Sequence, residues 1–167
     1  MTDAAPGGER GAVTGGPGDE QPVGIDELLE RVRSGYARTE AREAYDAARR
    51  GAALLVDIRY AALREKDGLI PGALVVERNE LEWRLDPWGS HRVPEATGHD
   101  LRVVVICNEG YASSLAAASL HGLGLRRATD LVGGFQAWRA AGLPVTAPPG
   151  PPGPDALGPG PGSGPAQ

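Results

Sequence analysis

Hydrophobic residues in the middle of this chain follow two alternating patterns. The first is a short run of consecutive apolar residues, which is typical of a strand buried inside a parallel sheet. Such runs lie within 53–57, 74–76 and 101–106, and a fourth strand is expected at 128–131. The second has apolar residues three or four positions apart with a glycine near its end, which predicts a helix. Segments of this kind lie at 25–32, 40–50, 113–121 and 135–141.

The order of these segments predicts an α/β fold. Strands and helices alternate along the chain, and this arrangement favours a parallel sheet that carries helices on both faces. A further short strand is expected at 36–39. The strongest predicted strand is 101–106, because all of its residues except Arg102 are apolar.

The two ends of the chain differ in composition from the middle. Residues 1–22 are rich in Gly, Pro and acidic residues, and residues 147–167 are mostly Pro and Gly. Segments with so few apolar residues cannot bury enough surface to fold. We therefore expect one domain at 23–146 between two disordered tails, which serve either as solubilising ends or as docking segments.

Composition narrows the possible partners and compartments. The 167 residues suffice for one ordinary domain, and the net charge of −5 does not favour nucleic acid as a partner. The first twenty residues lack the apolar core of a signal peptide, and no run approaches the ~18 apolar residues that a membrane-spanning helix needs. Neither nucleic acid nor a membrane is therefore expected as a partner. Cys107 is the only cysteine, so an intramolecular disulfide is impossible and the expected location is cytoplasmic.

Cys107 follows directly after the strongest predicted strand, and a predicted helix begins six residues later. In open α/β sheets, ligands bind beyond the carboxyl ends of the strands, where Cys107 is expected to lie. The loop can turn several backbone N–H groups inward, and the start of the helix adds partial positive charge, so both favour an anion such as a thiolate or a persulfide. Gly110 suits the backbone turn, and Ser113 and Ser114 can cap the helix or offer hydroxyls to the sulfur.

The surroundings of Cys107 argue against other roles. A free cysteine after an apolar strand is often a small core residue, but a loop followed by a helix favours a reactive one. His91, His99 and His121 have no metal-ligand spacing with Cys107, so no metal site is expected. His99 with Asp100 is interpreted as a turn pair rather than as a general base.

Five short motifs, taken in order, carry a resemblance to a known family. Their sequences are LLVDIR at 54–59, LIPGA at 69–73, CNEGYAS at 107–113, GGFQAW at 133–138 and AGLPV at 141–145. They resemble the motifs of the single-domain rhodanese family, whose active-site loop corresponds to the third of them. The resemblance covers about residues 36–145. It implies a rhodanese-like three-layer α/β/α domain with a central, mostly parallel five-stranded sheet.

The resemblance also implies a sulfurtransferase that needs no metal or organic cofactor. Cys107 would take a sulfane sulfur from a thiosulfate, polysulfide or persulfide donor, become a persulfide, and pass the sulfur to a nucleophilic acceptor. The expected partners are a small sulfur donor and a thiol or protein acceptor. Backbone N–H groups of the loop would stabilise the charged sulfur, and the loop residues are Asn108, Glu109, Gly110, Tyr111, Ala112 and Ser113.

Three arginines are candidate substrate-binding residues beside this loop. Arg59 ends the first motif, although with Asp57 it can also tie strand ends to neighbouring loops. Arg78 and Arg84 belong to a segment, 77–88, that is rich in Trp and Arg and would supply a cation and an apolar wall near the loop mouth. The alternative for this segment is a surface helix with an anchoring tryptophan and Arg–Glu pairs.

Two positions depart from the family's pattern. Leu69 stands where histidine is usual, which removes a structural hydrogen bond without touching the sulfur. The loop also lacks arginine and contains Glu109, whereas thiosulfate-using members commonly place a cation there. A carboxylate beside an anion site disfavours a dianionic donor. We therefore expect thiosulfate to be a poor substrate, and a protein persulfide or a low-molecular-weight thiol to be the real donor or acceptor.

Two rival functions use the same features. A phosphatase or arsenate reductase also holds an anion in a cysteine loop, but its reaction requires a Cys-x5-Arg pattern. The sixth residue after Cys107 is Ser113, so this arginine is missing. The other rival is a catalytically idle rhodanese-like module that binds proteins, and Glu109 keeps this reading open. A gain of sulfur by the protein would separate the enzyme from such a module.

Overall fold

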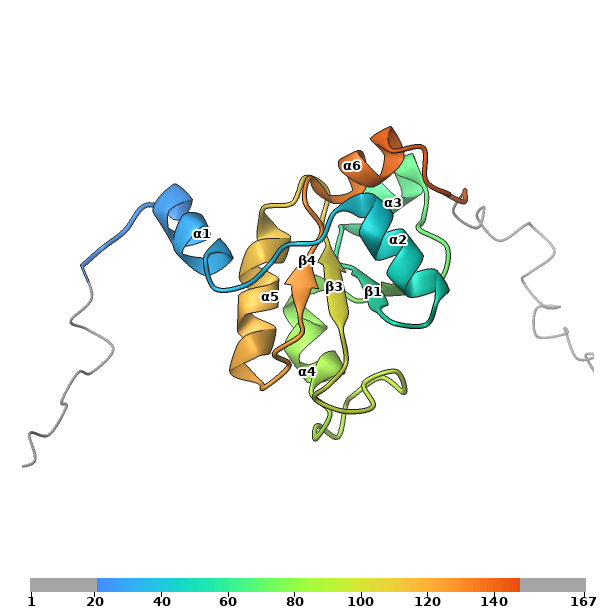
Figure 1. Cartoon of the computed structure of the whole chain (residues 1–167). Coiled ribbons are helices and arrows are strands. Elements are labelled where there is room, and N and C mark those ends of the chain that lie inside the picture. Colours follow the sequence, from blue (N-terminus) through green and yellow to red (C-terminus); the bar gives the residue numbers. More distant parts are fainter. Residues whose placement is uncertain (1–20, 148–167) are drawn as a thin grey trace, which may run out of the picture.

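The computed structural model describes residues 21–147, which are drawn in colour in Figure 1. Its strands are β1 (Leu54–Asp57), β2 (Leu74–Val75), β3 (Val103–Ile106) and β4 (Thr129–Asp130). Its helices are α1 (Ile25–Arg33), α2 (Ala41–Arg49), α3 (Ala61–Asp67), α4 (Leu81–Leu85), α5 (Ala112–Gly122) and α6 (Gly134–Ala140), with a 3-10 turn, η1, at Arg78–Glu80. The eight segments predicted from hydrophobic periodicity are therefore confirmed. Nearly all of the two predicted tails lies outside the described residues.

The four strands form a parallel sheet in the order β2-β1-β3-β4. The fifth strand expected at 36–39 is not formed: only Thr39 pairs, through a single parallel bridge to Leu131 just after β4. Tyr36 and Arg38 direct their side chains to the carboxylate of Asp130 instead, and the backbone follows β4 only around Thr39. The expected number of strands is therefore corrected from five to four within the described residues.

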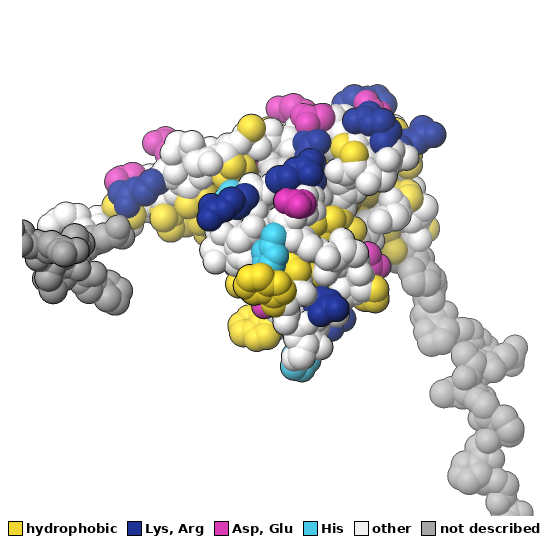
Figure 2. Space-filling model, turned by 60° about the horizontal axis from the view of Figure 1, so that its bottom comes forward, with side chains coloured by type: hydrophobic (Ala, Val, Ile, Leu, Met, Phe, Trp, Pro, Cys, Tyr) yellow, Lys and Arg dark blue, Asp and Glu magenta, His cyan; other side chains and the backbone are white. Residues whose placement is uncertain are grey.

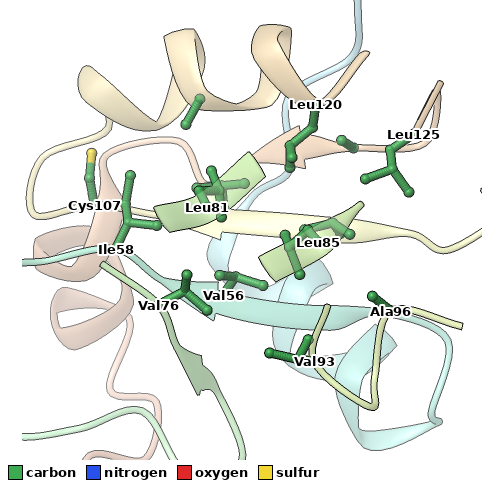
Figure 3. Close-up of a cluster of buried hydrophobic side chains, with 14 residues drawn as sticks. Val56, Ile58, Val76, Leu81, Leu85, Val93, Ala96, Cys107, Leu120 and Leu125 are labelled. Atoms are coloured by element: carbon green, nitrogen blue, oxygen red, sulfur yellow. The ribbon is translucent and has the colours of Figure 1, made fainter. Parts of the chain in front are cut away.

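Alternate residues of the central strand β3 face opposite sides of the sheet, and a hydrophobic cluster covers each side. Val103 and Val105 pack in the cluster that Figure 3 shows, together with leucines of α4 and α5. Val104 and Ile106 pack on the other side with residues of α2 and α6. The predicted α/β architecture with helices on both faces is thus confirmed. Burial on both sides also explains why β3 is a continuous apolar run in the sequence.

The segment 77–88 forms a surface helix, but leucines rather than a tryptophan anchor it. Leu81 and Leu85 of α4 are fully buried, whereas Trp83 is 64% exposed and Trp88 is 85% exposed. Figure 2 shows hydrophobic side chains exposed at the lower edge of the face that it draws. Among residues 21–147, no helix is long and apolar enough to cross a bilayer.

Candidate active site

The sulfur of Cys107 lies at the carboxyl end of β3, in a loop that leads into α5. It sits at the edge of the first hydrophobic cluster, near Ile58 (Figure 3), and Cys107 is 8% exposed. Two backbone N–H groups donate hydrogen bonds to the sulfur, from Gly110 at 3.1 Å and from Ser113 at 3.4 Å. The Ser113 hydroxyl oxygen is 3.2 Å from the sulfur. Because these donors converge on one atom at the start of a helix, the site favours a negatively charged sulfur.

Gly110 gives the loop its shape and is held from behind by two arginines. Its φ of +82° lies in the left-handed region, and an added Cβ would come within 2.7 Å of the backbone nitrogen of Gly133. Its carbonyl oxygen accepts hydrogen bonds from Nη2 of Arg33 at 2.8 Å and Nη2 of Arg38 at 2.9 Å. The Gly110 N–H that points at the sulfur is therefore fixed by residues more than seventy positions earlier in the chain.

A buried carboxylate, Asp130 at the end of β4, organises the floor beneath the loop. Arg38 binds both of its oxygens at 2.9 Å, and the Tyr36 hydroxyl donates to Oδ1 at 2.8 Å. The hydroxyls of Ser113 and Ser114 donate to Oδ2 at 2.8 and 2.9 Å. Burial alone would raise the pKa of Asp130, but the hydrogen bonds from Arg38, Tyr36 and Ser113 outweigh it and lower this pKa. Burial and the neighbouring Asp130 raise the pKa of Tyr36, so the tyrosine stays a neutral donor.

The lowered pKa of Asp130 predicts a loss of stability in acid. Because this pKa is lower in the folded than in the unfolded chain, its contribution is fully present above about pH 4 and is lost as the pH falls through the folded value. We expect the free energy of unfolding of the wild type, measured in urea from about pH 7 to about pH 3, to fall more steeply than that of Asp130→Asn. The variant is less stable at neutral pH, because Arg38 loses its partner. Equal slopes for the two proteins would contradict this role.

A cavity of about 220 Å³ opens beside Cys107. Most of its wall is apolar or aromatic, from Ile58, Tyr60, Leu63, Tyr111 and Ala112. The charged residues that line it are Arg59, Arg78 and Glu109. Tyr60 is 75% exposed and Tyr111 is 59% exposed, so two phenol rings stand at its rim. A small ligand with an apolar body fits these walls better than a compact, highly charged anion.

The structure brings all six of the predicted loop residues and two of the three arginines to the sulfur or to this cavity. Asn108, Glu109, Tyr111 and Ala112 line the cavity, and Gly110 and Ser113 bind the sulfur. The Asn108 side chain is held by Gln136, whose Nε2 donates to its Oδ1 at 3.0 Å.

The three candidate arginines are in different situations. The side chain of Arg59 is fully buried and forms an ion pair with Asp57 at 2.7 Å, which fits its structural role. Arg78 lines the cavity and pairs with Glu82 at 2.9 Å. Arg84 does not line the Cys107 cavity: it donates to the carbonyl oxygen of His91 and lines a separate hollow with Trp83. Arg78 lies in η1 and Arg84 lies six positions later, near the end of α4, so the two side chains reach different hollows.

Sequence reasoning missed the residues that support the loop from below. The residues Arg33, Tyr36 and Arg38 precede Gly110 by more than seventy positions, and no local pattern links them to the loop. Asp130 could have been found, because a carboxylate at the carboxyl end of a predicted buried strand lies at the edge where such sheets place their sites.

Comparison with known proteins gives a consistent assignment. The Rhodanese-like domain family matches residues 40–141. A protein named "Sulfurtransferase" from Allochromatium vinosum is 39% identical over 97 residues, which cover 58% of this chain and 81% of that protein.

Two solved structures share the fold. A protein of unknown function from Rhodopseudomonas palustris, described as a possible tyrosine phosphatase, has a TM-score of 0.67 and 32% identity, covering 78% of this chain and 100% of its own. A rhodanese-related protein from Thermoplasma volcanium has a TM-score of 0.54 and 26% identity, covering 68% of this chain and 100% of its own. With its cysteine loop, its parallel sheet and these relatives, the chain belongs to the rhodanese-like domain family.

Proposed function

We propose that this protein is a sulfurtransferase that carries a sulfane sulfur on Cys107. The observation that carries the proposal is the convergence of two backbone N–H groups on the sulfur of the only cysteine in the chain, with the Ser113 hydroxyl oxygen 3.2 Å from it. Such a cradle stabilises the thiolate, which is the reactive form of cysteine. The family assignment and the relative named "Sulfurtransferase" support the same chemistry.

The transfer proceeds in two displacements with no net change in oxidation state. The Cys107 thiolate attacks the outer sulfur of a donor, a new S–S bond forms, and the bond between that sulfur and the rest of the donor breaks. The leaving group keeps the electron pair. A thiolate acceptor then attacks the outer sulfur of the Cys107 persulfide, and Cys107 leaves as a thiolate.

The cavity favours an organic persulfide or a polysulfide over thiosulfate as the donor. Its wall is mainly apolar, and Glu109, which is exposed, adds a negative charge at the mouth. Both arginines that line the cavity are already paired with a carboxylate, Arg59 with Asp57 and Arg78 with Glu82. Thiosulfate carries two negative charges and has no apolar body, so both features of the site act against it.

A phosphatase activity, which the description of the Rhodopseudomonas palustris protein suggests for that protein, lacks its key group here. Phosphate transfer in a cysteine loop requires a bidentate arginine six residues after the cysteine. Ser113 occupies this position, and its hydroxyl lies against Asp130. Without that arginine, the loop has no bidentate partner for a bound phosphate dianion.

The proposal is tested by the intact mass of the purified, reduced protein after incubation with a polysulfide. We expect a gain of one sulfur, about 32 Da, that dithiothreitol or cyanide removes and that Cys107→Ala does not show. Thiosulfate should give much less of the same product. A folded, reduced wild-type protein that gains no sulfur from any donor would favour the protein-binding module instead.

The variant Glu109→Gln removes the negative charge at the cavity mouth. In the same mass assay, its use of thiosulfate relative to polysulfide should rise by about threefold to tenfold over the wild type.

A further inference from the structure

The hydroxyl of Ser113 lies between two groups that can accept its single proton. Its oxygen is 2.8 Å from Oδ2 of Asp130 and 3.2 Å from the sulfur of Cys107. Ser113 is fully buried, so water does not reach this hydroxyl from the surface. The direction in which the O–H points must therefore be decided by which of the two acceptors needs it more.

Asp130 does not need the Ser113 proton. A carboxylate offers about four lone-pair sites. Four other donors already occupy Asp130: Nε and Nη2 of Arg38, the Tyr36 hydroxyl and the Ser114 hydroxyl. The hydrogen bond from Ser113 is a fifth, which the carboxylate can lose while it stays fully hydrogen-bonded. The pairing with Arg38 also keeps the carboxylate charge compensated.

The sulfur, by contrast, needs this proton as soon as it becomes an anion. A neutral Cys107 thiol donates its own proton to the Ser113 oxygen, and the Ser113 hydroxyl then points at Asp130. A thiolate has no proton to give, and the same arrangement would turn a lone pair of the Ser113 oxygen toward a negative charge. Such a repulsion inside a buried site is costly.

We propose that Ser113 is a catalytic hydroxyl switch, pointing at Asp130 when Cys107 is a neutral thiol and rotating to the sulfur when Cys107 is a thiolate. The consequence for turnover rests on the proposed sulfur transfer. In that reaction the Cys107 thiolate is the nucleophile of the first displacement and the leaving group of the second, so the switch promotes both. Asp130 is a positioning residue that holds the Ser113 oxygen in place.

Asp130 is not the base that takes the thiol proton. Its pKa is lowered, because hydrogen bonds from Arg38, Tyr36 and Ser113 outweigh its burial, and so the carboxylate is a poor proton acceptor. The other ionisable groups around Cys107 are Arg33, Tyr36, Arg38, Arg59, Tyr60, Arg78, Glu109 and Tyr111. The substitutions proposed below change none of these groups, so they isolate the contribution of the hydroxyl.

Ser113→Ala and Ser114→Ala form a matched pair for the test. Both remove a buried hydroxyl that donates to Oδ2 of Asp130, but only the Ser113 hydroxyl lies within hydrogen-bonding distance of the sulfur. The Ser114 hydroxyl also accepts from Nε of Arg33, but the bond from Nη2 of Arg33 to Gly110 does not involve Ser114. The measurement is the rate of alkylation of Cys107 by iodoacetamide as a function of pH. We expect the midpoint of this profile to rise by about one pH unit in Ser113→Ala and to stay at the wild-type value in Ser114→Ala.

Ser113→Thr keeps a hydroxyl on the same carbon and should retain the wild-type midpoint. If Ser113→Ala does not fold, Ser113→Thr is measured in its place. An unshifted midpoint in Ser113→Ala, or an equal shift in Ser114→Ala, overturns the switch. Alkylation does not depend on any sulfur donor. A shifted midpoint in a protein that gains no sulfur would therefore refute the proposed function while leaving the hydroxyl switch standing.

Discussion

Replacing Gly134 with alanine is expected to abolish sulfur transfer and to lower the free energy of unfolding by about 2–6 kcal/mol. Gly134 has a φ of +60°, where a side chain is strained. An added Cβ would also come within 2.4 Å of the carbonyl oxygen of Cys107 and 2.7 Å of the carbonyl carbon of Asn108. These are backbone atoms that cannot rotate away, so the loop that carries the sulfur must move.

The start of α6 makes this movement damaging for the site. The N–H of Phe135 donates to the carbonyl oxygen of Cys107 at 2.8 Å, and the N–H of Gln136 donates to that of Asn108 at 3.1 Å. A shift of the loop breaks these bonds and turns the donors that face the sulfur. Catalytic geometry tolerates only a fraction of an ångström of displacement, so activity should fall further than stability alone predicts.

Gly51→Ala is the matched control for Gly134→Ala. Gly51 has a similar φ of +69°, but nothing lies within 4 Å of an added Cβ. This variant carries only the strain of a left-handed residue, about 1–2 kcal/mol, and should transfer sulfur at the wild-type rate. Urea unfolding and the polysulfide mass assay compare the three proteins. Similar losses in both variants would show that backbone strain, and not contact with the cysteine loop, causes the defect.

The sequence predicts best those strands that are buried on both faces of the sheet. β3 is buried on both faces, so its four residues form an uninterrupted apolar run that identifies it without any other information. The segment 36–39 has the composition of a strand but does not form one. The side chains of Tyr36 and Arg38 instead bind Asp130, which lies over ninety positions later in the sequence. No pattern within residues 36–39 indicates this contact.

Some features of the candidate site also follow from the local sequence, and others depend on distant residues. The position of Cys107 follows from local order, because a strand, a loop and a helix succeed one another within the sequence. The support of its loop by Arg33 and Arg38 does not, because it depends on how α1 and the following segment lie against α5. Arg84 belongs to the segment that the sequence predicts to lie near the loop. Its side chain nevertheless donates to the carbonyl oxygen of His91, which no local pattern in the sequence indicates.

Replacing Asp57 with asparagine is expected to lower the free energy of unfolding by about 3–5 kcal/mol, because it leaves the buried charge of Arg59 without its counter-ion. The side chains of both residues are almost fully buried, and three hydrogen bonds join Nε and Nη2 of Arg59 to the carboxylate. The remaining support of the guanidinium is the carbonyl oxygen of Gly68 and the face of Phe135, 3.7 Å away. Its Nη1 has no hydrogen-bond partner among the described residues.

Glu27→Gln gives the comparison for an exposed pair. Glu27 and Arg31 are joined at 3.0 Å, nearly the same distance, but both side chains are more than half exposed. Loss of this pair should change the free energy of unfolding by less than about 1 kcal/mol, since water and salt already screen it. If urea unfolding gives equal losses for Asp57→Asn and Glu27→Gln, burial of Arg59 is not what makes its pair important.

The double variant Asp57→Leu with Arg59→Met then decides between the two roles considered for Arg59. Replacing both charges with apolar groups leaves no buried ion unpaired, so stability should return to within about 1 kcal/mol of the wild type. Arg59 borders the Cys107 cavity, and an arginine that bound the donor would be needed for sulfur transfer even in a stable protein. Because its side chain is fully buried and engaged with Asp57, we expect the stable double variant to keep most of its activity in the polysulfide assay. Loss of activity at restored stability would instead make Arg59 a substrate-binding residue.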